Sequence, residues 1–306
     1  MRNILVTGGT VFVSRYLAEY FVKKGDKVYV LNRNSRPQSE GVILIAADRN
    51  ALGDKLKRYH FDIVIDVSAY TKADVEKLVC ALNEEDIKTC EYFFISSSAV
   101  YPETLLQPFT EEMKCGVNSI WGAYGTNKLE AEQYLQEHVP QSYILRPPYL
   151  YGPMQNVYRE PFVFDCAKME RAFYMPKDGS MKLQFFHIND LCRFIEVLLE
   201  KKPEQHIFNV GNKEMIDINR WASMCYEVVG TKYEPIFVDT KEHEQRAFFC
   251  FHDYEYYLDV TKQETLMPET KSLKEGLMES YEWYMQNEEQ VRKRPYLDYI
   301  ENEIKL

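Results

Sequence analysis

The stretch ILVTGGTVFVS, residues 4–14, decides the fold of this 306-residue chain. It starts as a short apolar run rich in β-branched residues and turns sharply at a pair of glycines. A helical pattern of apolar residues then runs over residues 12–23, and Gly25 is expected to end that helix. Residues 28–31 form the next apolar run. Strand, glycine turn, helix and strand together make one β-α-β unit.

The same alternation continues along the chain. Further strands are expected at residues 42–45, 63–65, 92–95 and 143–145, with helices near 50–59, 72–83 and 120–138. These strands are continuous apolar runs, which is typical of a parallel sheet buried on both faces. The sequence therefore predicts an α/β fold, a Rossmann-type doubly wound parallel sheet, with a smaller C-terminal substrate-binding lobe.

The regular pattern breaks after Pro147, where proline, glycine and aromatic residues become frequent. We expect residues 1–150 to form the nucleotide-binding domain. The segment 187–210, with a helix near 189–201 and a strand at 207–210, is expected to return to it. Residues 151–186 and 211–306, with helices near 217–229 and 272–287, are expected to form the second lobe.

Composition narrows the classes of function. The net charge is −10 and the sequence pI is about 5.3, which disfavours nucleic acid as a partner because like charges repel. The seven cysteines are odd in number and form no CxxC pair, so neither a disulfide framework nor a metal site is expected. No apolar run is long enough for a membrane span or a signal peptide. We therefore expect a cytoplasmic protein that does not associate with membranes.

The glycine turn is the first candidate binding site, because a dinucleotide pyrophosphate sits where such a turn opens a helix. Gly8 takes the first glycine place of the spacing GxxGxxG. Val11 and Ser14 stand where that spacing has its other two glycines. The alternative is a plain tight turn in a Rossmann-like protein that has lost its cofactor.

Two positions bear on the adenosine end of a dinucleotide. Asn32-Arg33 closes the second strand, where an acidic residue would favour NAD and an arginine favours the 2′-phosphate of NADP. Asp48 closes the third strand and could hydrogen-bond an adenine amino group. The alternatives are a solvated surface arginine and an aspartate that only shapes a turn.

A serine run and a YxxxK pattern carry the candidate chemistry. Ser97 follows the fifth strand, and Tyr124 and Lys128 lie four residues apart on one helix face. A nearby ammonium favours the phenolate and can lower the pKa of the tyrosine, which makes it a usable base. Alone, YxxxK is a frequent chance match on an amphipathic helix. The pattern is much less easily explained by chance when it follows a β-α-β repeat and a serine segment.

The order of these motifs resembles the NAD-dependent epimerase/dehydratase family, the extended short-chain dehydrogenases. The segments that carry the resemblance are the glycine loop, SSSAVY (96–101), YGTNK (124–128), LRPPYLYGP (145–153) and FHIND (186–190). The glycine loop and the ending of the second strand look most like an atypical branch that includes chloroplast stem-loop-binding-like proteins.

The resemblance implies roles for single residues. Tyr124 would be the acid/base, Lys128 would orient the nicotinamide ribose and tune Tyr124, and Ser97 would be the catalytic hydroxyl. The implied cofactor contacts also include Thr7, Gly8, Thr10, Val11, Phe12, Asn32, Arg33, Asp48, Ser68, Ala69, Pro147 and Tyr149. The candidate substrate contacts are Ser98, Lys182 and Arg246. Leu183 stands where sugar-nucleotide epimerases carry a phosphate-binding arginine, and Lys182 could substitute for it.

Three functions follow in order of preference. The first is an NAD(P)-dependent epimerase, dehydratase or reductase that acts on a nucleotide sugar or a related hydroxyl or keto substrate, with NADP slightly favoured over NAD. The second is a regulatory protein that binds NAD(P) without turnover, and the third is an RNA-binding relative. Family members often pair through two long helices, so a homodimer through the helices near 72–83 and 120–138 is expected.

Overall fold

The structure, a computed structural model, describes residues 1–304. The chain forms two compact units. Unit 1 contains Met1–Pro148, Ile188–Gly211 and Leu258–Glu269, and unit 2 contains Tyr149–His187, Asn212–Tyr257 and the chain from Thr270 onward. No helix in the described part is long and apolar enough to cross a membrane.

One boundary differs from the sequence expectation, which placed all of 211–306 in the second lobe. Leu258–Glu269 belongs to unit 1, because Leu258 pairs with the backbone of Phe109. In addition, the side chain of Gln263 accepts a hydrogen bond from the Gly211 amide at 2.8 Å. Both contacts join residues far apart in the sequence, so a local sequence pattern cannot predict them.

Unit 1 is built on a seven-stranded sheet in the order β11-β6-β5-β4-β1-β2-β3. Its strands are β1 (Asn3–Thr7), β2 (Lys27–Asn32), β3 (Ile43–Ala46), β4 (Ile63–Asp66), β5 (Glu91–Ile95), β6 (Tyr143–Arg146) and β11 (Ile207–Asn209). Every neighbouring pair is parallel. The predicted Rossmann-type, doubly wound α/β fold is therefore confirmed.

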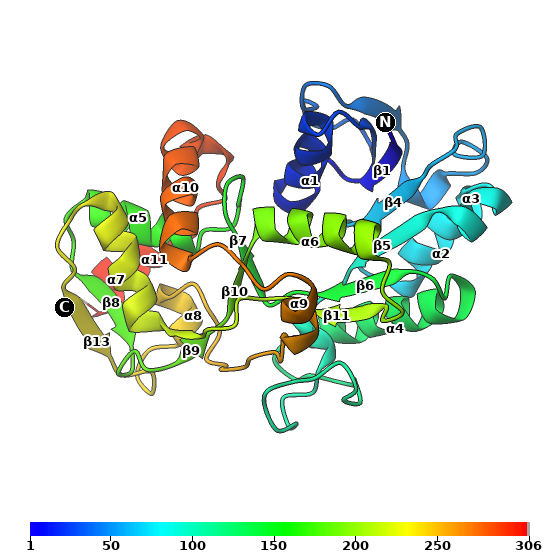
Figure 1. Ribbon diagram of the computed structural model, residues 1–306. Coiled ribbons are helices and arrows are strands. Elements are labelled where there is room, and N and C mark those ends of the chain that lie inside the picture. Colours follow the sequence, from blue (N-terminus) through cyan, green and yellow to red (C-terminus); the bar gives the residue numbers. More distant parts are fainter. Residues whose placement is uncertain (305–306) are drawn as a thin grey trace. The chain divides into compact units, whose positions relative to one another are not determined.

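Helices cover both faces of this sheet. They are α1 (Phe12–Lys23), α2 (Lys72–Ala81), α3 (Glu84–Thr89), α4 (Ala123–His138), α6 (Ile188–Lys201) and α9 (Thr261–Leu266). Figure 1 shows α1 and α6 on one side and α2 and α4 on the other. Strands β1 and β4 are adjacent and lead to helices on opposite faces, so the gap at their carboxyl ends is the topological switch point where such sheets bind ligands.

The first helix begins and ends as the sequence predicts. Gly25, at φ +86°, follows the helix, and its amide donates to the Val22 carbonyl at 3.0 Å. The next amide, that of Asp26, donates to the Phe21 carbonyl at 3.1 Å. This pair of bonds is the Schellman arrangement, which satisfies carbonyls that the end of a helix leaves open.

Two of the helix predictions are wrong in part. Residues 50–59 form a 3₁₀ turn, η1 (Arg49–Ala51), followed by turns rather than a helix. Gly53 has φ +51° there, which breaks helical geometry. The helix expected over 72–83 ends at Ala81, and Asn83 instead caps α3 by accepting the Asp86 amide at 2.7 Å.

Unit 2 is smaller and rich in aromatic residues. It contains the strands β7 (Tyr149–Tyr151), β8 (Phe173–Pro176), β9 (Lys182–Leu183), β10 (Phe185–His187), β12 (Ile216–Asp217) and β13 (Pro235–Val238), and the helices α5 (Glu160–Lys168), α7 (Ile218–Val229), α8 (Gln245–Phe248), α10 (Leu273–Gln286) and α11 (Tyr296–Tyr299). Its core packs α5, α7 and α10 around rings such as Phe162 and Trp221.

Candidate active site

A threonine hydroxyl joins the two strands at the switch point. Thr7, the last residue of β1, donates to the Asp66 carboxylate of β4 at 2.7 Å. The same oxygen accepts the amides of Val67 and Ser68, each at 3.0 Å. One donor and two acceptors are all that a hydroxyl offers. The Thr7 side chain, expected to contact a cofactor, is thus already fully bonded within the protein.

Asp66 is fully buried and bound from three sides. Besides Thr7, the Arg49 guanidinium contacts both of its oxygens, the shorter distance being 2.6 Å, and the Tyr92 hydroxyl donates at 3.0 Å. Arg49 also donates to the exposed Ser68 hydroxyl at 3.2 Å. This network fixes the carboxyl end of β4, and sequence reasoning missed both of its charged members.

The glycine loop keeps its tight turn despite its two departures from the GxxGxxG spacing. Gly8 and Gly9 have φ +94° and +89°, and a Cβ on Gly8 would lie 2.8 Å from the Ser14 hydroxyl. That hydroxyl donates to the Val11 carbonyl at 3.0 Å, so a serine is accommodated here.

Val11 provides no side-chain cap for α1, and the half-buried Thr10 precedes it. The first helical residue, Phe12, is buried at φ +30°. The first-turn amides of an uncapped helix are open to an anion such as a phosphate. This end of α1 therefore suits the pyrophosphate of a dinucleotide.

The residues expected at the adenosine end lie on two loops of unit 1. The Asn32 amide group donates to the Gly8 carbonyl at 2.7 Å and thereby ties the β2 loop to the glycine loop. Arg33 is exposed and makes no ion pair with any residue in the range 1–304. Asp48 is exposed and caps η1 by accepting the Asn50 amide at 2.8 Å. This contact agrees with the alternative interpretation, in which Asp48 shapes a turn.

The structure brings Ser97 and Tyr124 together. Ser97 follows β5 and caps the 3₁₀ turn η2 (Ser98–Val100) by accepting the Ala99 amide at 3.2 Å. Its hydroxyl also interacts with the Tyr124 phenol and affects the pKa of that phenol. Helix α4 can approach η2 this closely because Gly125 has no side chain, and a Cβ there would collide with the Ala99 carbonyl oxygen.

Ser98 and Pro147 lie next to this pair. Ser98 is buried, and its amide donates to the Pro147 carbonyl at 3.0 Å. This bond joins the serine segment to the chain that follows β6. Ser98 was expected to contact substrate, and its burial fits a role in holding the segment.

Lys128 lies one turn along α4 and is 3% exposed. Its ammonium donates to the carbonyls of Ala69 and Ile95, both at 2.8 Å. It also lies 5.4 Å from the centre of the Tyr70 ring, and that ring is 6.1 Å from the Tyr124 ring. Tyr70, which is largely exposed, is an aromatic residue of the site that sequence reasoning missed.

The electrostatics differ from the sequence expectation. Desolvation raises the pKa of the Tyr124 phenol although the residue as a whole is partly exposed, and the Ser97 hydroxyl opposes the rise. Lys128 is not among the groups that shift the Tyr124 pKa, and its ammonium is bound to main-chain carbonyls. The expected lowering of the Tyr124 pKa by Lys128 is therefore wrong for this arrangement. Burial also lowers the pKa of Lys128 itself to about 8.

A buried ion pair contacts the serine segment (residues 96–98) through Ser96. Glu132, one turn beyond Lys128, binds Arg146 of β6 through several hydrogen bonds, the shortest 2.6 Å. The Ser96 hydroxyl donates to Glu132 at 2.5 Å. Arg146 also donates to the Tyr101 hydroxyl at 2.8 Å. Both charged residues are at most 3% exposed, and sequence reasoning missed the pair.

Three expected contacts belong to unit 2. The Tyr149 ring is packed edge-on against Phe251 with 4.9 Å between centres. Arg246 donates to the Phe249 carbonyl at 3.1 Å and acts electrostatically on Tyr149. Lys182 is exposed in β9, and its amide donates to the Glu255 carboxylate at 2.7 Å.

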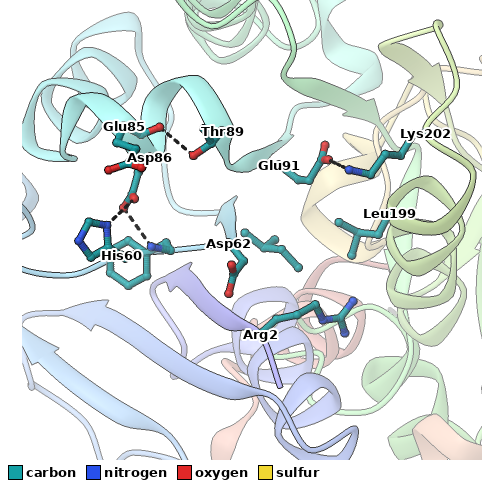
Figure 2. Close-up of a pocket in the computed structure, with 11 residues that line it drawn as sticks. Arg2, His60, Asp62, Glu85, Asp86, Thr89, Glu91, Leu199 and Lys202 are labelled. Carbon is teal, nitrogen blue, oxygen red and sulfur yellow. Dashed lines mark hydrogen bonds and ion pairs between the residues drawn. The ribbon is translucent and has the colours of Figure 1, made fainter.

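The hollow drawn in Figure 2 is not at this site. It has a volume of about 440 Å³ and lies at the amino ends of β1, β4 and β5, the edge opposite to Ser97. Its charged groups pair with one another, as Lys202 does with Glu91 at 2.6 Å and His60 with Asp86 at 3.3 Å. Sheets of this kind bind their ligands at the carboxyl edge.

The Lys128 pKa gives a testable dependence of stability on pH. An unfolded lysine has a pKa of about 10.4, so between that value and about 8 the unfolded chain binds a proton that the folded protein does not. Stability conferred by this site should therefore rise with pH across that window, by on the order of 3 kcal/mol. In urea unfolding from pH 8 to 10, Lys128→Met should lack this rise, and identical slopes in both proteins would contradict the assignment.

These features define a class of protein. A parallel sheet of Rossmann order, an uncapped helix after a glycine turn, and a serine, a tyrosine and a lysine at the carboxyl edge describe a short-chain dehydrogenase-like, dinucleotide-binding protein. Residues 4–211 match the sequence model of the NAD dependent epimerase/dehydratase family, and the chain belongs to that family.

Known proteins similar to this chain agree with that assignment. The chloroplast stem-loop binding protein of 41 kDa b from Arabidopsis thaliana is 27% identical over 305 residues, which cover 92% of this chain and 78% of the relative. A dTDP-glucose 4,6-dehydratase from Bacillus anthracis, solved with NAD, superposes with a TM-score of 0.76 at 18% identity over 95% of this chain and 99% of that one. A UDP-glucose 4-epimerase from Thermotoga maritima, solved with UDP-glucose, superposes with a TM-score of 0.74 at 19% identity. That match covers 93% of this chain and 99% of the epimerase chain.

Proposed function

We propose that the protein is an NAD(P)-dependent epimerase, dehydratase or reductase acting on a nucleotide sugar or a related hydroxyl or keto substrate. The observation that carries the proposal is the close packing of helix α4 on η2, which places Tyr124 beside Ser97, with buried Lys128 one helical turn away. The two solved neighbours are a dehydratase and an epimerase of nucleotide sugars, which supports the substrate class.

Different residues of unit 1 would bind the cofactor, transfer the proton and hold the substrate oxygen. Backbone amides at the start of α1 and the loop at Gly8 would hold the pyrophosphate, and Arg33 and Asp48 would face the adenosine. The bound nicotinamide would supply hydride transfer. Tyr124 would take the proton from a substrate hydroxyl, or return it to a keto oxygen, while the Ser97 hydroxyl holds that oxygen.

Lys128 supports this chemistry by its charge. Below a pH of about 8 it remains an ammonium, which can donate hydrogen bonds to a bound cofactor. Two of its three donors bind carbonyls, and the third is available for a ribose hydroxyl. Pro147 of unit 1 is proposed to lie by the nicotinamide. Lys182 and Arg246 of unit 2 are proposed to contact the substrate phosphates.

The decisive experiment has two steps. Native mass spectrometry of freshly purified protein would show whether NAD or NADP remains bound. Nucleotide sugars and small ketones would then be screened for a change in the absorbance of the reduced nicotinamide. Bound cofactor without turnover of any nucleotide sugar would instead favour a regulatory protein that binds NAD(P).

Cofactor preference depends on Arg33, which is exposed and unpaired within residues 1–304. A charge-assisted bond to the 2′-phosphate contributes about 1.5–3 kcal/mol. Calorimetry on Arg33→Ala should therefore show NADP affinity reduced by roughly 10- to 100-fold and NAD affinity unchanged. Arg58→Ala, which removes another exposed guanidinium of unit 1, is the control. Equal NADP affinity in wild type and Arg33→Ala would contradict the NADP preference.

A two-fold homodimer through α2 and α4 is also proposed, by analogy with the family. The exposed faces of these helices are largely polar, and among their described residues Tyr124 is the single large apolar side chain that is exposed. Such an interface would depend on polar contacts more than on apolar burial. Light scattering at micromolar protein tests this proposal, and a monomer throughout would contradict it.

A further inference from the structure

Strand β13 of unit 2 is an edge strand with one side open. It pairs in parallel with β8 (Figure 1), and no other strand among residues 1–304 pairs with it. Its side chains Ile236 and Phe237 are 41% and 54% exposed. An exposed apolar edge strand is a template on which another chain can add a strand.

The bonds to β8 show which backbone groups of β13 face outward. The Glu234 carbonyl accepts the Phe173 amide at 2.8 Å, and the Val238 carbonyl accepts the Lys177 amide at 2.9 Å. Even-numbered residues of this segment therefore face β8. Because a strand alternates with a period of two, the odd-numbered residues face outward, and they are Pro235, Phe237 and Asp239. This orientation suits a proline, which has no amide hydrogen to give to β8.

One arrangement satisfies every outward group, namely antiparallel pairing with a second copy of β13 about a two-fold axis at Phe237. The two Phe237 residues then exchange two N–H···O bonds, and each Asp239 amide donates to the Pro235 carbonyl of the other copy. The missing amide hydrogen of Pro235 leaves no gap. It would face the Asp239 carbonyl, which already accepts the amides of Glu242 and His243 at 3.3 and 3.2 Å.

The side chains agree with the same register. Phe237 meets its own copy on the axis as an aromatic pair, and Ile236 lies opposite Val238. Lys232, which is exposed, falls opposite the exposed Glu242, and no two like charges are opposed between residues 231 and 243. A shift of the axis to Ile236 would instead leave the Phe237 carbonyl facing the proline nitrogen, without a donor.

We infer that β13 is an interface between two copies of this chain. Pairing joins two β8-β13 ribbons into one four-stranded sheet, which is more stable than a two-stranded ribbon. A contact of five residues from each copy is small beside the roughly 1,200–2,000 Å² buried in a stable complex. It is therefore weak alone and would join dimers formed elsewhere, such as the one proposed through α2 and α4. It does not depend on the proposed catalytic activity.

Disulfide cross-linking tests both the contact and its register. Hydrogen-bonded residues of an antiparallel pair have Cα atoms about 5.5 Å apart, within the roughly 4.4–6.8 Å that a disulfide spans. Phe237→Cys should therefore form a covalent dimer when the concentrated protein is oxidised with diamide. In Ile236→Cys the two Cα atoms would be about 7–8 Å apart, which is too far for a disulfide.

Ile236→Cys is thus the matched control, because it places an exposed cysteine on the same strand. Wild type gives the background from its own exposed Cys80. The inference predicts a covalent dimer well above that background in Phe237→Cys alone. No more dimer in Phe237→Cys than in wild type would overturn the interface, and equal dimer in the two variants would overturn the ordered pairing.

Light scattering gives a second measurement that needs no new cysteine. As wild type is concentrated, its average mass should rise toward twice the value at micromolar protein. Phe237→Lys should abolish this rise, because two ammonium groups would lie opposite each other on the axis. Met285→Lys, which changes another exposed apolar residue of unit 2, should keep the rise. A constant mass in wild type, or a rise that persists in Phe237→Lys, would overturn the inference.

Discussion

Replacing Tyr124 with phenylalanine is expected to lower turnover by about 10²–10⁴-fold, the usual contribution of general acid–base catalysis. The change removes one hydroxyl and keeps the ring, so packing against Tyr70 and affinity for the cofactor should survive. The measurement is the steady-state rate with whichever substrate the nicotinamide screen identifies, together with calorimetry of cofactor binding.

Variants of nearby residues distinguish catalysis from cofactor binding in this site. Ser97→Ala should lower turnover with little change in cofactor affinity, and Lys128→Met should lower both. Tyr134→Phe removes another phenol hydroxyl from the same helix, where the ring stacks on His138, and should retain the full rate. If Tyr124→Phe keeps the full rate on an active substrate, the catalytic assignment is wrong even though the fold stands.

Glu132→Gln is expected to lower the free energy of unfolding by about 3–5 kcal/mol, because it leaves the Arg146 charge buried and uncompensated. Arg146 is 3% exposed and would keep only uncharged partners, the Tyr101 hydroxyl and the amide oxygen of the introduced glutamine. Urea unfolding followed by circular dichroism measures the change. Such a loss is a large fraction of the stability of a typical domain.

Two controls identify the cause of that loss. The double variant Glu132→Leu with Arg146→Met should be more stable than Glu132→Gln, because no unpaired charge remains buried. Asp54→Asn breaks an exposed pair with Lys57 and should leave the unfolding midpoint unchanged. A change below about 1 kcal/mol in Glu132→Gln would show that the buried pair does not hold the serine segment.

The sequence predicted the fold well because the strands of a doubly wound sheet are apolar along their whole length. It failed at residues 50–59 for a physical reason. Leu52 and Leu56 have helical spacing and are both buried, yet Gly53 between them turns the chain. Helix α5 was missed for the opposite reason. Its residues Glu160–Ala167 are all buried, so no polar face marks a helical period.

The candidate site was predictable where a motif fixes both residue type and spacing. Ser97 follows β5, Tyr124 and Lys128 lie on α4, and the structure places both segments at one edge of the sheet. The partners that hold them were not predictable. Arg49 with Asp66 and Glu132 with Arg146 are 17 and 14 residues apart, and only the folded sheet shows that each arginine meets its carboxylate.

The way the chain is divided between its units has a consequence for dissecting the protein. The polypeptide passes from one unit to the other after Pro148, His187, Gly211, Tyr257 and Glu269. No single cut can therefore release either unit intact, and a truncation before Leu258 would remove a piece of the nucleotide-binding unit along with the tail. Gene fragments that end at a motif boundary would encode incomplete cores, so activity should be lost with any large C-terminal deletion.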